Sequence, residues 1–143
     1  MKEIKVYIAS PYTNGWMPTN VRRQFKCADE LLELDYFPYV PLLTHFMELY
    51  SHREEHKWLE LDFVFLKTCD AVLRLKPTNG DGKEIPSPGA DMEEKLANEN
   101  GIPVFYSVED LNDYFKTNHT QGKMPIFDEE FLKQKYSDLT SDV

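Results

Sequence analysis

Apolar residues along the first 116 positions follow two repeating patterns. Short runs rich in strand-forming residues cover residues 4–9, 37–40, 71–75 and 103–106. Apolar side chains at intervals of three or four, which predict helices, recur over residues 21–34, 54–68, 90–100 and 108–116. Because single helices separate the strands, the pattern predicts right-handed βαβ units and an α/β fold with a parallel sheet.

The connections between these elements indicate where a ligand would bind. The first strand stops at a Ser-Pro-Tyr turn at residues 10–12, and residues 41–51 form an irregular aromatic stretch. Residues 76–88 form a loop rich in proline and glycine. Since ligands of parallel sheets bind at the carboxyl ends of the strands, we expect the site in the loops that follow the first and third strands.

The chain after residue 116 differs from what precedes it. A polar linker leads to an apolar patch at residues 125–127 and to a short predicted helix over residues 128–136. We therefore divide the chain into a domain of residues 1–116 and a C-terminal tail of residues 117–143. The sequence does not decide whether this tail packs on its own domain or on a neighbouring subunit.

Composition places the chain among folded globular proteins that need no cofactor to fold. The chain has 143 residues, about the length of one domain, of which 41% are hydrophobic and 29% are charged. Its two cysteines, Cys27 and Cys69, lie far apart and show neither CxxC nor Cys/His spacing. The sequence therefore suggests no zinc site and no disulfide framework, and we expect no metal or organic cofactor.

Charge and hydropathy narrow the range of partners. Sixteen basic and 25 acidic residues give a net charge of −9, which argues against binding to a nucleic acid polymer but permits a small nucleotide. No apolar run approaches the roughly 18 residues of a membrane span, and the first residues lack the apolar core of a secretory signal. We expect a cytoplasmic protein that does not enter a membrane.

One carboxylate lies on the apolar face of the helix over residues 54–68. Helical spacing places Asp62 beside Trp58, Phe65 and Leu66 in a stripe that should be buried. A buried charge is costly unless it is paired. Asp62 is therefore either a structural aspartate satisfied by a backbone group or a basic side chain, or a functional group.

The helix over residues 90–100 repeats this anomaly. Glu93 shares its face with Leu96 and Ala97, whereas Glu94 lines up with Asn98 on the polar side. Glu93 also lies in the first turn, where the positive end of the helix dipole favours an anion, so an ordinary capping glutamate is the alternative. Two inward carboxylates suit glycosidic cleavage, in which one attacks the anomeric carbon and the other assists the departing group.

Four segments carry a resemblance to the nucleoside 2-deoxyribosyltransferase superfamily, which includes the 2′-deoxynucleoside 5′-phosphate N-hydrolases. They read VYIASPYT at 6–13, DFVFLKTCDAVL at 62–73, SPGADMEEKLA at 87–97 and GIPVF at 101–105. The resemblance implies a flavodoxin-like three-layer sandwich with a parallel sheet of about five strands. It also implies a retaining mechanism in which Glu93, the last residue of the G-x-x-x-E segment that begins at Gly89, becomes covalently glycosylated.

The resemblance also assigns roles to other residues. Asp62 matches the aspartate that handles the base while the leaving group is protonated, and Tyr12 resembles a tyrosine near the nucleophile. Ser87 corresponds to a position that meets the 5′ end of the sugar and is a serine in the phosphohydrolases. Ser10 and Gly89 lie in the matching segments and are expected to contact the substrate.

Two departures from the family pattern bear on the substrate. The loop after the first strand lacks the serine- and arginine-rich sequence of the phosphohydrolases, although Arg22 or Arg23 could replace its charge. Asp91 stands where the family usually has glycine. The 5′-phosphate is therefore less strongly indicated than the deoxyribosyl group.

Two aromatic residues are further candidates for contact with the base. His45 lies in an aromatic segment, although a histidine near apolar residues is more often structural. Trp16 could stack on a base, but a tryptophan in such a loop is as often a packing anchor.

From these observations we predict an enzyme that cleaves the N-glycosidic bond of a 2′-deoxynucleoside or its 5′-monophosphate through a covalent glycosyl-enzyme, with transfer to water or another base. The resemblance further implies a homodimer or larger homo-oligomer, in which residues 127–136 are a candidate contact. A non-catalytic nucleotide-binding or sensor module of the same fold is the alternative. A scaffold subunit would leave the two inward carboxylates unexplained.

Overall fold

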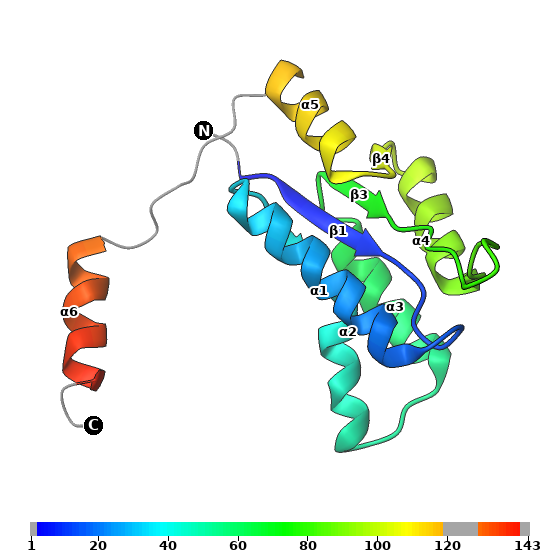
Figure 1. Cartoon of the computed structure of the whole chain (residues 1–143), viewed down its shortest axis with the longest axis horizontal. Helices are drawn as coiled ribbons and strands as arrows, with labels where there is room; N and C mark the ends of the chain where they lie inside the picture. Colours follow the sequence, from blue (N-terminus) through cyan, green and yellow to red (C-terminus); the bar gives the residue numbers. More distant parts are fainter. Residues whose placement is uncertain (1–2, 119–128, 141–143) are drawn as a thin grey trace.

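The computed structural model describes residues 3–118 and 129–140 (Figure 1). Strands and helices alternate along it as the sequence predicts. The strands are β1 (Lys5–Ala9), β2 (Phe37–Tyr39), β3 (Ala71–Arg74) and β4 (Val104–Phe105). The helices are α1 (Met17–Glu33), α2 (Pro41–Thr44), the 3₁₀ helix η1 (His45–Leu49), α3 (Glu55–Leu66), α4 (Pro88–Glu99), α5 (Val108–Asn118) and α6 (Glu129–Thr140).

The strands form one parallel sheet in the order β2-β1-β3-β4. In its centre, Tyr7 of β1 lies opposite Val72 of β3. The predicted α/β class with a parallel sheet is thereby confirmed. The described residues contain four strands, whereas the family resemblance implies about five. The described residues that follow α5 form the helix α6.

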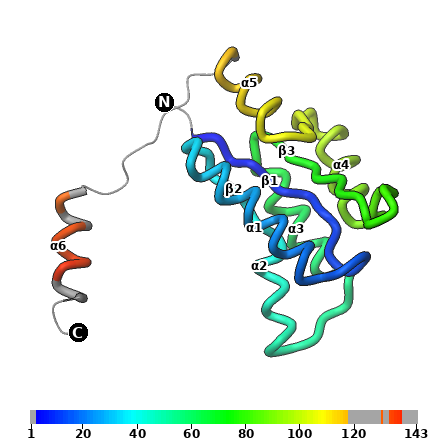
Figure 2. Tube along the Cα trace, in the orientation of Figure 1, coloured from blue at the N-terminus to red at the C-terminus, as the bar shows by residue number. Residues whose placement is uncertain are grey.

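Helices cover both faces of the sheet and complete three layers (Figure 2). Because successive side chains of a strand point to opposite faces, β1 contributes to two apolar clusters. Ile4, Val6 and Ile8 pack with residues of α1 and α5, including Leu31 and Leu111. On the other face the remaining β1 residues meet α3 and α4, in a cluster of Tyr7, Ala9, Leu66, Cys69, Val72, Ala90 and Ala97. Side chains of α3 and α4 that reach beyond this second cluster can therefore meet at one edge of the sheet.

Two sequence expectations about local structure are wrong. Residues 41–51 are mostly helical, because Pro41 starts α2 with its φ angle preset for a helix and η1 continues the turn. Phe65, which was expected in the buried stripe of α3, is 44% exposed and stacks on the ring of Tyr39 with 5.0 Å between centroids. Helical spacing identified the face of α3 but not the width of the covered stripe.

The tail contains the helix that the sequence predicts there, although it spans residues 129–140 as α6. The apolar patch at residues 125–127 lies outside the described residues. Within the described part of the chain, no helix combines the length and the apolar character that a membrane span requires.

Candidate active site

A cleft opens at the carboxyl ends of β1 and β3, where the sequence places the ligand site. It encloses about 100 Å³. Its walls come from the loop after β1, the start of α2 and η1, one face of α3, and the loop that leads into α4. Asp62 and Glu93 both line it. The cleft is thus where the two carboxylates that helical spacing singled out converge.

Glu93 enters the cleft from the first turns of α4. The residue is only 7% exposed, and among the described residues its Oε2 atom has no hydrogen-bond partner. Burial raises the pKa of the Glu93 carboxyl to about 8; the charge of Asp62 adds to this rise, while Tyr7 and Arg74 oppose it. The burial of Glu93 confirms the prediction that this glutamate points inward. Its carboxylate is a stronger base than that of an ordinary glutamate.

Asp62 faces the same cleft from α3 and is 3% exposed. Its Oδ2 atom lies 3.7 Å from Nε2 of His45, and its Oδ1 atom has no hydrogen-bond partner within the described chain. Burial raises the pKa of the Asp62 carboxyl, and the His45 contact partly offsets that rise. No lysine or arginine within salt-bridge distance of Asp62 is found among the described residues, so the basic partner expected of a structural aspartate is replaced by an imidazole.

His45 is held in the cleft by two aromatic rings. The Tyr12 ring meets it edge-on at 4.9 Å, and the Trp58 ring stacks on it at 5.2 Å. The Trp58 indole N–H donates a hydrogen bond to the Glu48 carboxylate, which ties α3 to η1. The imidazole is therefore fixed beside Asp62 in the lining of the cleft.

The tyrosine nearest the nucleophile candidate is Tyr7, and the sequence analysis missed it. Tyr12 lines the cleft but contacts His45. Tyr7 is fully buried in β1, and burial followed by the charges of Glu93 and Asp62 raises the pKa of its phenol well above the usual value. Its alternation with Val6 and Ile8 was the available signal, because it places the Tyr7 phenol on the α3 and α4 side of the sheet.

The serines predicted to bind substrate also hold the site together. Ser87 is the N-cap of α4, and its Oγ atom accepts a hydrogen bond of 3.3 Å from the Ala90 backbone N–H. Ser10 Oγ accepts one of 2.7 Å from the Gln24 amide, whose oxygen accepts from the Leu42 N–H. Both serines line the cleft. Sequence patterns gave no sign of the buried Gln24. Its side chain links α1 to the loop after β1 and to the start of α2.

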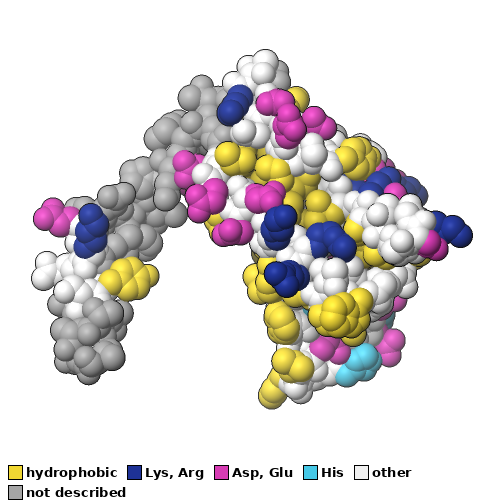
Figure 3. Space-filling model, viewed as in Figure 1, with side chains coloured by type: hydrophobic (Ala, Val, Ile, Leu, Met, Phe, Trp, Pro, Cys, Tyr) yellow, Lys and Arg dark blue, Asp and Glu magenta, His cyan; other side chains and the backbone are white. Residues whose placement is uncertain are grey.

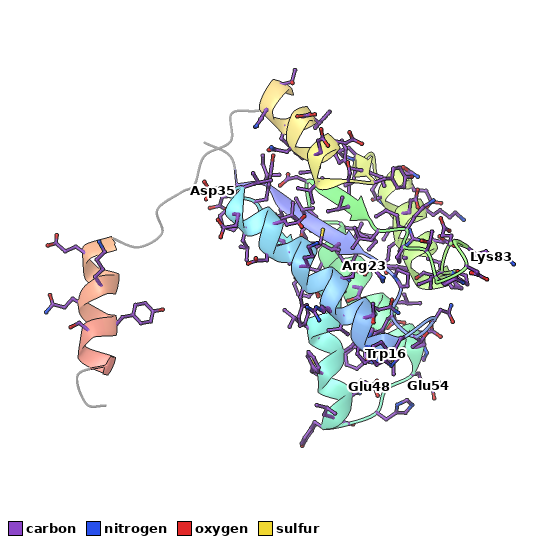
Figure 4. All side chains as sticks on the ribbon, viewed as in Figure 1. Trp16, Arg23, Asp35, Glu48, Glu54 and Lys83 are labelled. Atoms are coloured by element: carbon purple, nitrogen blue, oxygen red, sulfur yellow. The ribbon has the colours of Figure 1, made fainter. Side chains whose placement is uncertain are left out.

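Gly89 and Trp16 behave differently. Gly89 lines the cleft, and a Cβ atom added there would make only an ordinary 3.7 Å contact with Leu59. Trp16 is 71% exposed and is not among the cleft residues, because it sits just before the first turn of α1 on the outside of the loop (Figure 4). The structure therefore does not bring Trp16 to the site as the sequence suggested.

Among the described residues, no lysine or arginine lines the cleft. Arg22 and Arg23, which were considered as substitutes for a phosphate-binding arginine, are absent from its lining, and Arg23 instead donates to Asn20 at 3.0 Å. Glu55, which the sequence analysis did not select, adds a third carboxylate from the first turn of α3. The charged side chains that line the cleft are thus acidic.

Glu94 does not face water as helical spacing suggested. Its side chain is 18% exposed, its Oε2 atom lies 3.5 Å from Nε of the buried Arg74, and its carboxylate accepts a hydrogen bond from the Tyr106 hydroxyl. Asp91, which replaces the usual glycine, lies 2.8 Å from Nη2 of the same arginine. Ion pairing with the buried Arg74 therefore explains why both of these positions of α4 are acidic.

In the residues that the structure describes, no group of three or more histidine, cysteine, aspartate or glutamate side chains could hold a metal ion.

Comparisons with known proteins agree on the fold. A family model described as "Domain of unknown function (DUF7768)" matches residues 4–107. The solved structure of a 2-deoxyribosyltransferase from Bacillus psychrosaccharolyticus superimposes with a TM-score of 0.60 at 19% sequence identity, covering 84% of this chain and 99% of the other. No curated protein matches. The chain therefore shares the flavodoxin-like fold of that structure.

Proposed function

The chain belongs to the family described as Domain of unknown function (DUF7768), and from its cleft we propose that it cleaves the N-glycosidic bond of a 2′-deoxynucleoside through a covalent glycosyl-enzyme. The observation that carries this proposal is the convergence of two buried carboxylates, Asp62 and Glu93, each with one oxygen that lacks a partner among the described residues. Such orphaned atoms are costly, and a substrate that supplies their partners would repay the cost.

In the proposed reaction the ionised Glu93 attacks the anomeric carbon, and the bond between that carbon and the base nitrogen breaks. The departing base takes a proton from the Asp62–His45 pair, which lines the same cleft. Water or a second base then attacks the anomeric carbon, gives its proton back to the Asp62–His45 pair, and breaks the ester bond to release Glu93. Absence of a 2-hydroxyl from the sugar eases formation of the oxocarbenium-like transition state, so a carboxylate suffices as nucleophile.

A purely binding module would not account for these carboxylates. A site that only holds an uncharged ligand gains nothing from a buried glutamate whose pKa is raised to about 8, whereas strongly perturbed pKa values cluster at catalytic sites. The solved structure that shares the fold is of a 2-deoxyribosyltransferase that is described as a biocatalyst for the synthesis of nucleosides. Both observations support glycosyl transfer or hydrolysis over the sensor alternative.

The cleft favours an uncharged nucleoside over a 5′-monophosphate. Within the described part of the chain, its lining includes Glu55, Asp62 and Glu93 but neither lysine nor arginine. The start of α4, a common phosphate site, has few free donors, because Pro88 has no N–H and Ser87 already occupies that of Ala90. We therefore favour the nucleoside, although a serine at position 87 resembles the phosphohydrolases, and give Ser87 a place at the 5′-hydroxyl.

We also propose that the enzyme works as a homodimer or larger homo-oligomer. Large apolar side chains are exposed beside the cleft, on α2, η1 and the residue after it; they are Leu43, Phe46, Met47, Leu49 and Tyr50. Figure 3 shows hydrophobic side chains gathered at the lower edge, below the sheet, where Figure 1 places α2. A second copy that covers them would also close the cleft. Sedimentation showing a fully active monomer would remove this part of the proposal.

The test of the function is release of free base from the four 2′-deoxynucleosides and their 5′-monophosphates, with and without an added second base. Release from a deoxynucleoside supports the proposal, and exchange with the added base identifies a transferase. Failure to turn over any of the eight compounds, in a protein that still binds nucleosides by calorimetry, would favour the binding module.

A further inference from the structure

A fully buried arginine lies directly behind the helix that carries Glu93. Arg74 ends β3 and is 1% exposed. Its Nη2 atom lies 2.8 Å from Oδ1 of Asp91, its Nε atom 3.5 Å from Oε2 of Glu94, and its Nη1 donates to the Leu75 carbonyl at 3.0 Å. One guanidinium thus joins the last residue of a central strand to the first two turns of α4.

The two acidic partners flank Glu93 along the helix. Asp91 and Glu94 are three positions apart and so lie on one side of α4, while Glu93 projects from another side into the cleft. The planar fork of an arginine binds two carboxylates in a fixed geometry, which a lysine cannot reproduce. The contact therefore restricts both the rotation of α4 about its axis and its distance from β3.

Packing alone does not explain a charge at this position. The other residues of β3 are Ala71, Val72 and Leu73, all buried and apolar, and an apolar residue would continue the pattern without the cost of desolvating a guanidinium. The start of α4 is already secured by the Ser87 cap. A buried positive charge near the base of a nucleophile has a functional use instead.

We propose that Arg74 is a positioning residue for Glu93, which orients the nucleophile through Asp91 and Glu94 and keeps a positive charge behind its carboxyl. This inference rests on the proposed function of Glu93. The electrostatics agree with the geometry, because the charge of Arg74 opposes the rise in the pKa of the Glu93 carboxyl. Without that charge a larger share of Glu93 would be protonated and unable to attack.

The experiment compares three variants of the full chain with a control. Arg74→Gln removes the charge, Arg74→Lys keeps the charge but loses the fork, and Arg74→Gln with Glu94→Gln removes the charge without leaving the largely buried Glu94 carboxylate unpaired. Arg23→Gln, a loss of charge outside the cleft, is the control. The Glu93 carboxyl is followed by ¹³C NMR during a pH titration of the substrate-free protein, with Glu93→Gln to identify its signal. Base release is measured over the same pH range.

Both variants with glutamine at position 74 should raise the pKa of the Glu93 carboxyl, so that turnover at neutral pH falls severalfold and recovers as the pH is raised. Arg74→Lys should titrate as the unmodified protein does and lose turnover at every pH. A merely structural arginine would lower turnover without moving the titration.

An unchanged Glu93 titration in a folded variant with glutamine at position 74 would overturn the proposal. The proposal would also be overturned if neither Arg74→Gln nor the double variant Arg74→Gln with Glu94→Gln folded, while Arg74→Lys folded normally. The NMR titration needs no substrate, so a failure of the proposed function, seen as absent base release in the unmodified protein, remains distinguishable from a failure of this inference.

Discussion

Two consecutive residues of α4, Glu93 and Glu94, show how one residue type meets opposite environments on two sides of a helix. Glu93 lies in the cleft with an oxygen that has no partner in the described chain, and burial raises its pKa to about 8. Glu94 lies on the Arg74 side, where a guanidinium and the Tyr106 hydroxyl bind its carboxylate. On the cleft side the protein makes ionisation of a carboxyl unfavourable, and on the Arg74 side it pairs a carboxylate with a positive charge.

The difference indicates which of the two carboxylates is available to a ligand and which one is used to hold the structure together. The hydrogen bonds and ion pairs of a paired carboxylate are already made with protein groups, whereas an unpaired carboxylate can still make them with a substrate or a transition state. Asp62 resembles Glu93 in this respect, because one of its oxygens is also without a partner among the described residues. Variants that remove the charge but keep the shape of a side chain, made on each side of the helix, test this distinction.

The largest effect is expected from Glu93→Gln. The amide fills the same volume but cannot attack the anomeric carbon, so turnover should fall by about 10⁴–10⁶-fold while substrate binding stays nearly intact. Base release in single-turnover assays and calorimetric binding measure the two quantities. Glu94→Gln, one residue away, removes only one anionic partner of Arg74 and leaves the nucleophile in place, so it should lower turnover far less.

A covalent label sharpens the same comparison. A slow 2-fluoro-2-deoxy nucleoside analogue should add its sugar mass to the peptide that contains both glutamates, and fragmentation should place it on Glu93. A label on Glu94, or an active Glu93→Gln protein, would contradict the central assignment.

Asp62→Asn should produce the next largest effect. The amide keeps the shape but cannot supply a proton to the departing base, which should lower turnover about 10²–10⁴-fold. A substrate analogue whose leaving group needs no proton should lose much less. Glu60→Gln, an exposed change on the same helix, is the control, and equal losses with both substrates would return Asp62 to a structural role.

A smaller effect is expected from pH. Because attack requires the ionised form of Glu93 and base departure requires a proton from the Asp62–His45 pair, kcat/KM should rise by up to about tenfold per pH unit below the Glu93 pKa of about 8 and should stop rising above it. Initial rates at low substrate concentration between pH 5.5 and 9, at constant ionic strength, measure this profile. A rate that is already level at pH 6 would show that Glu93 is ionised earlier than its burial implies.

The sequence was sufficient to predict the class of fold and the burial of the two carboxylates in one cleft. Both Asp62 and Glu93 stood out because a charge on an apolar helical face violates a strong energetic rule, and such a violation can be detected from spacing alone. The family resemblance supplied the sugar chemistry. The parallel sheet followed from the alternation of strands and helices, and the comparison of folds confirms it.

What the sequence could not provide are contacts between elements distant along the chain. Glu94 was placed in water because its partner Arg74 lies 20 positions earlier, on a strand whose neighbours were unknown. Tyr7 was overlooked in favour of Tyr12 because alternation gives the face of a strand but not the side chain it meets. The exposed Trp16 shows the converse error, since an aromatic residue in a loop need not reach the site.

The smallest expected effect is on stability, and it should differ in sign between the two sides of α4. Glu93 has a folded-state pKa of about 8 against an ordinary value near 4.5, so the folded protein binds more protons than the unfolded chain between these pH values. Stability from this group is present below pH 4.5 and is lost as the pH rises through 8. Glutamine has no proton to lose, so Glu93→Gln should stabilise the protein by about 1–3 kcal/mol at pH 8.5 and by little at pH 5. Glu94→Gln should instead destabilise it by about 1–2 kcal/mol at pH 8.5, because Arg74 then loses one of its two anionic partners. Urea unfolding of both variants at the two pH values measures these changes, and destabilisation by Glu93→Gln at pH 8.5 would show that its carboxylate is satisfied in the folded protein after all.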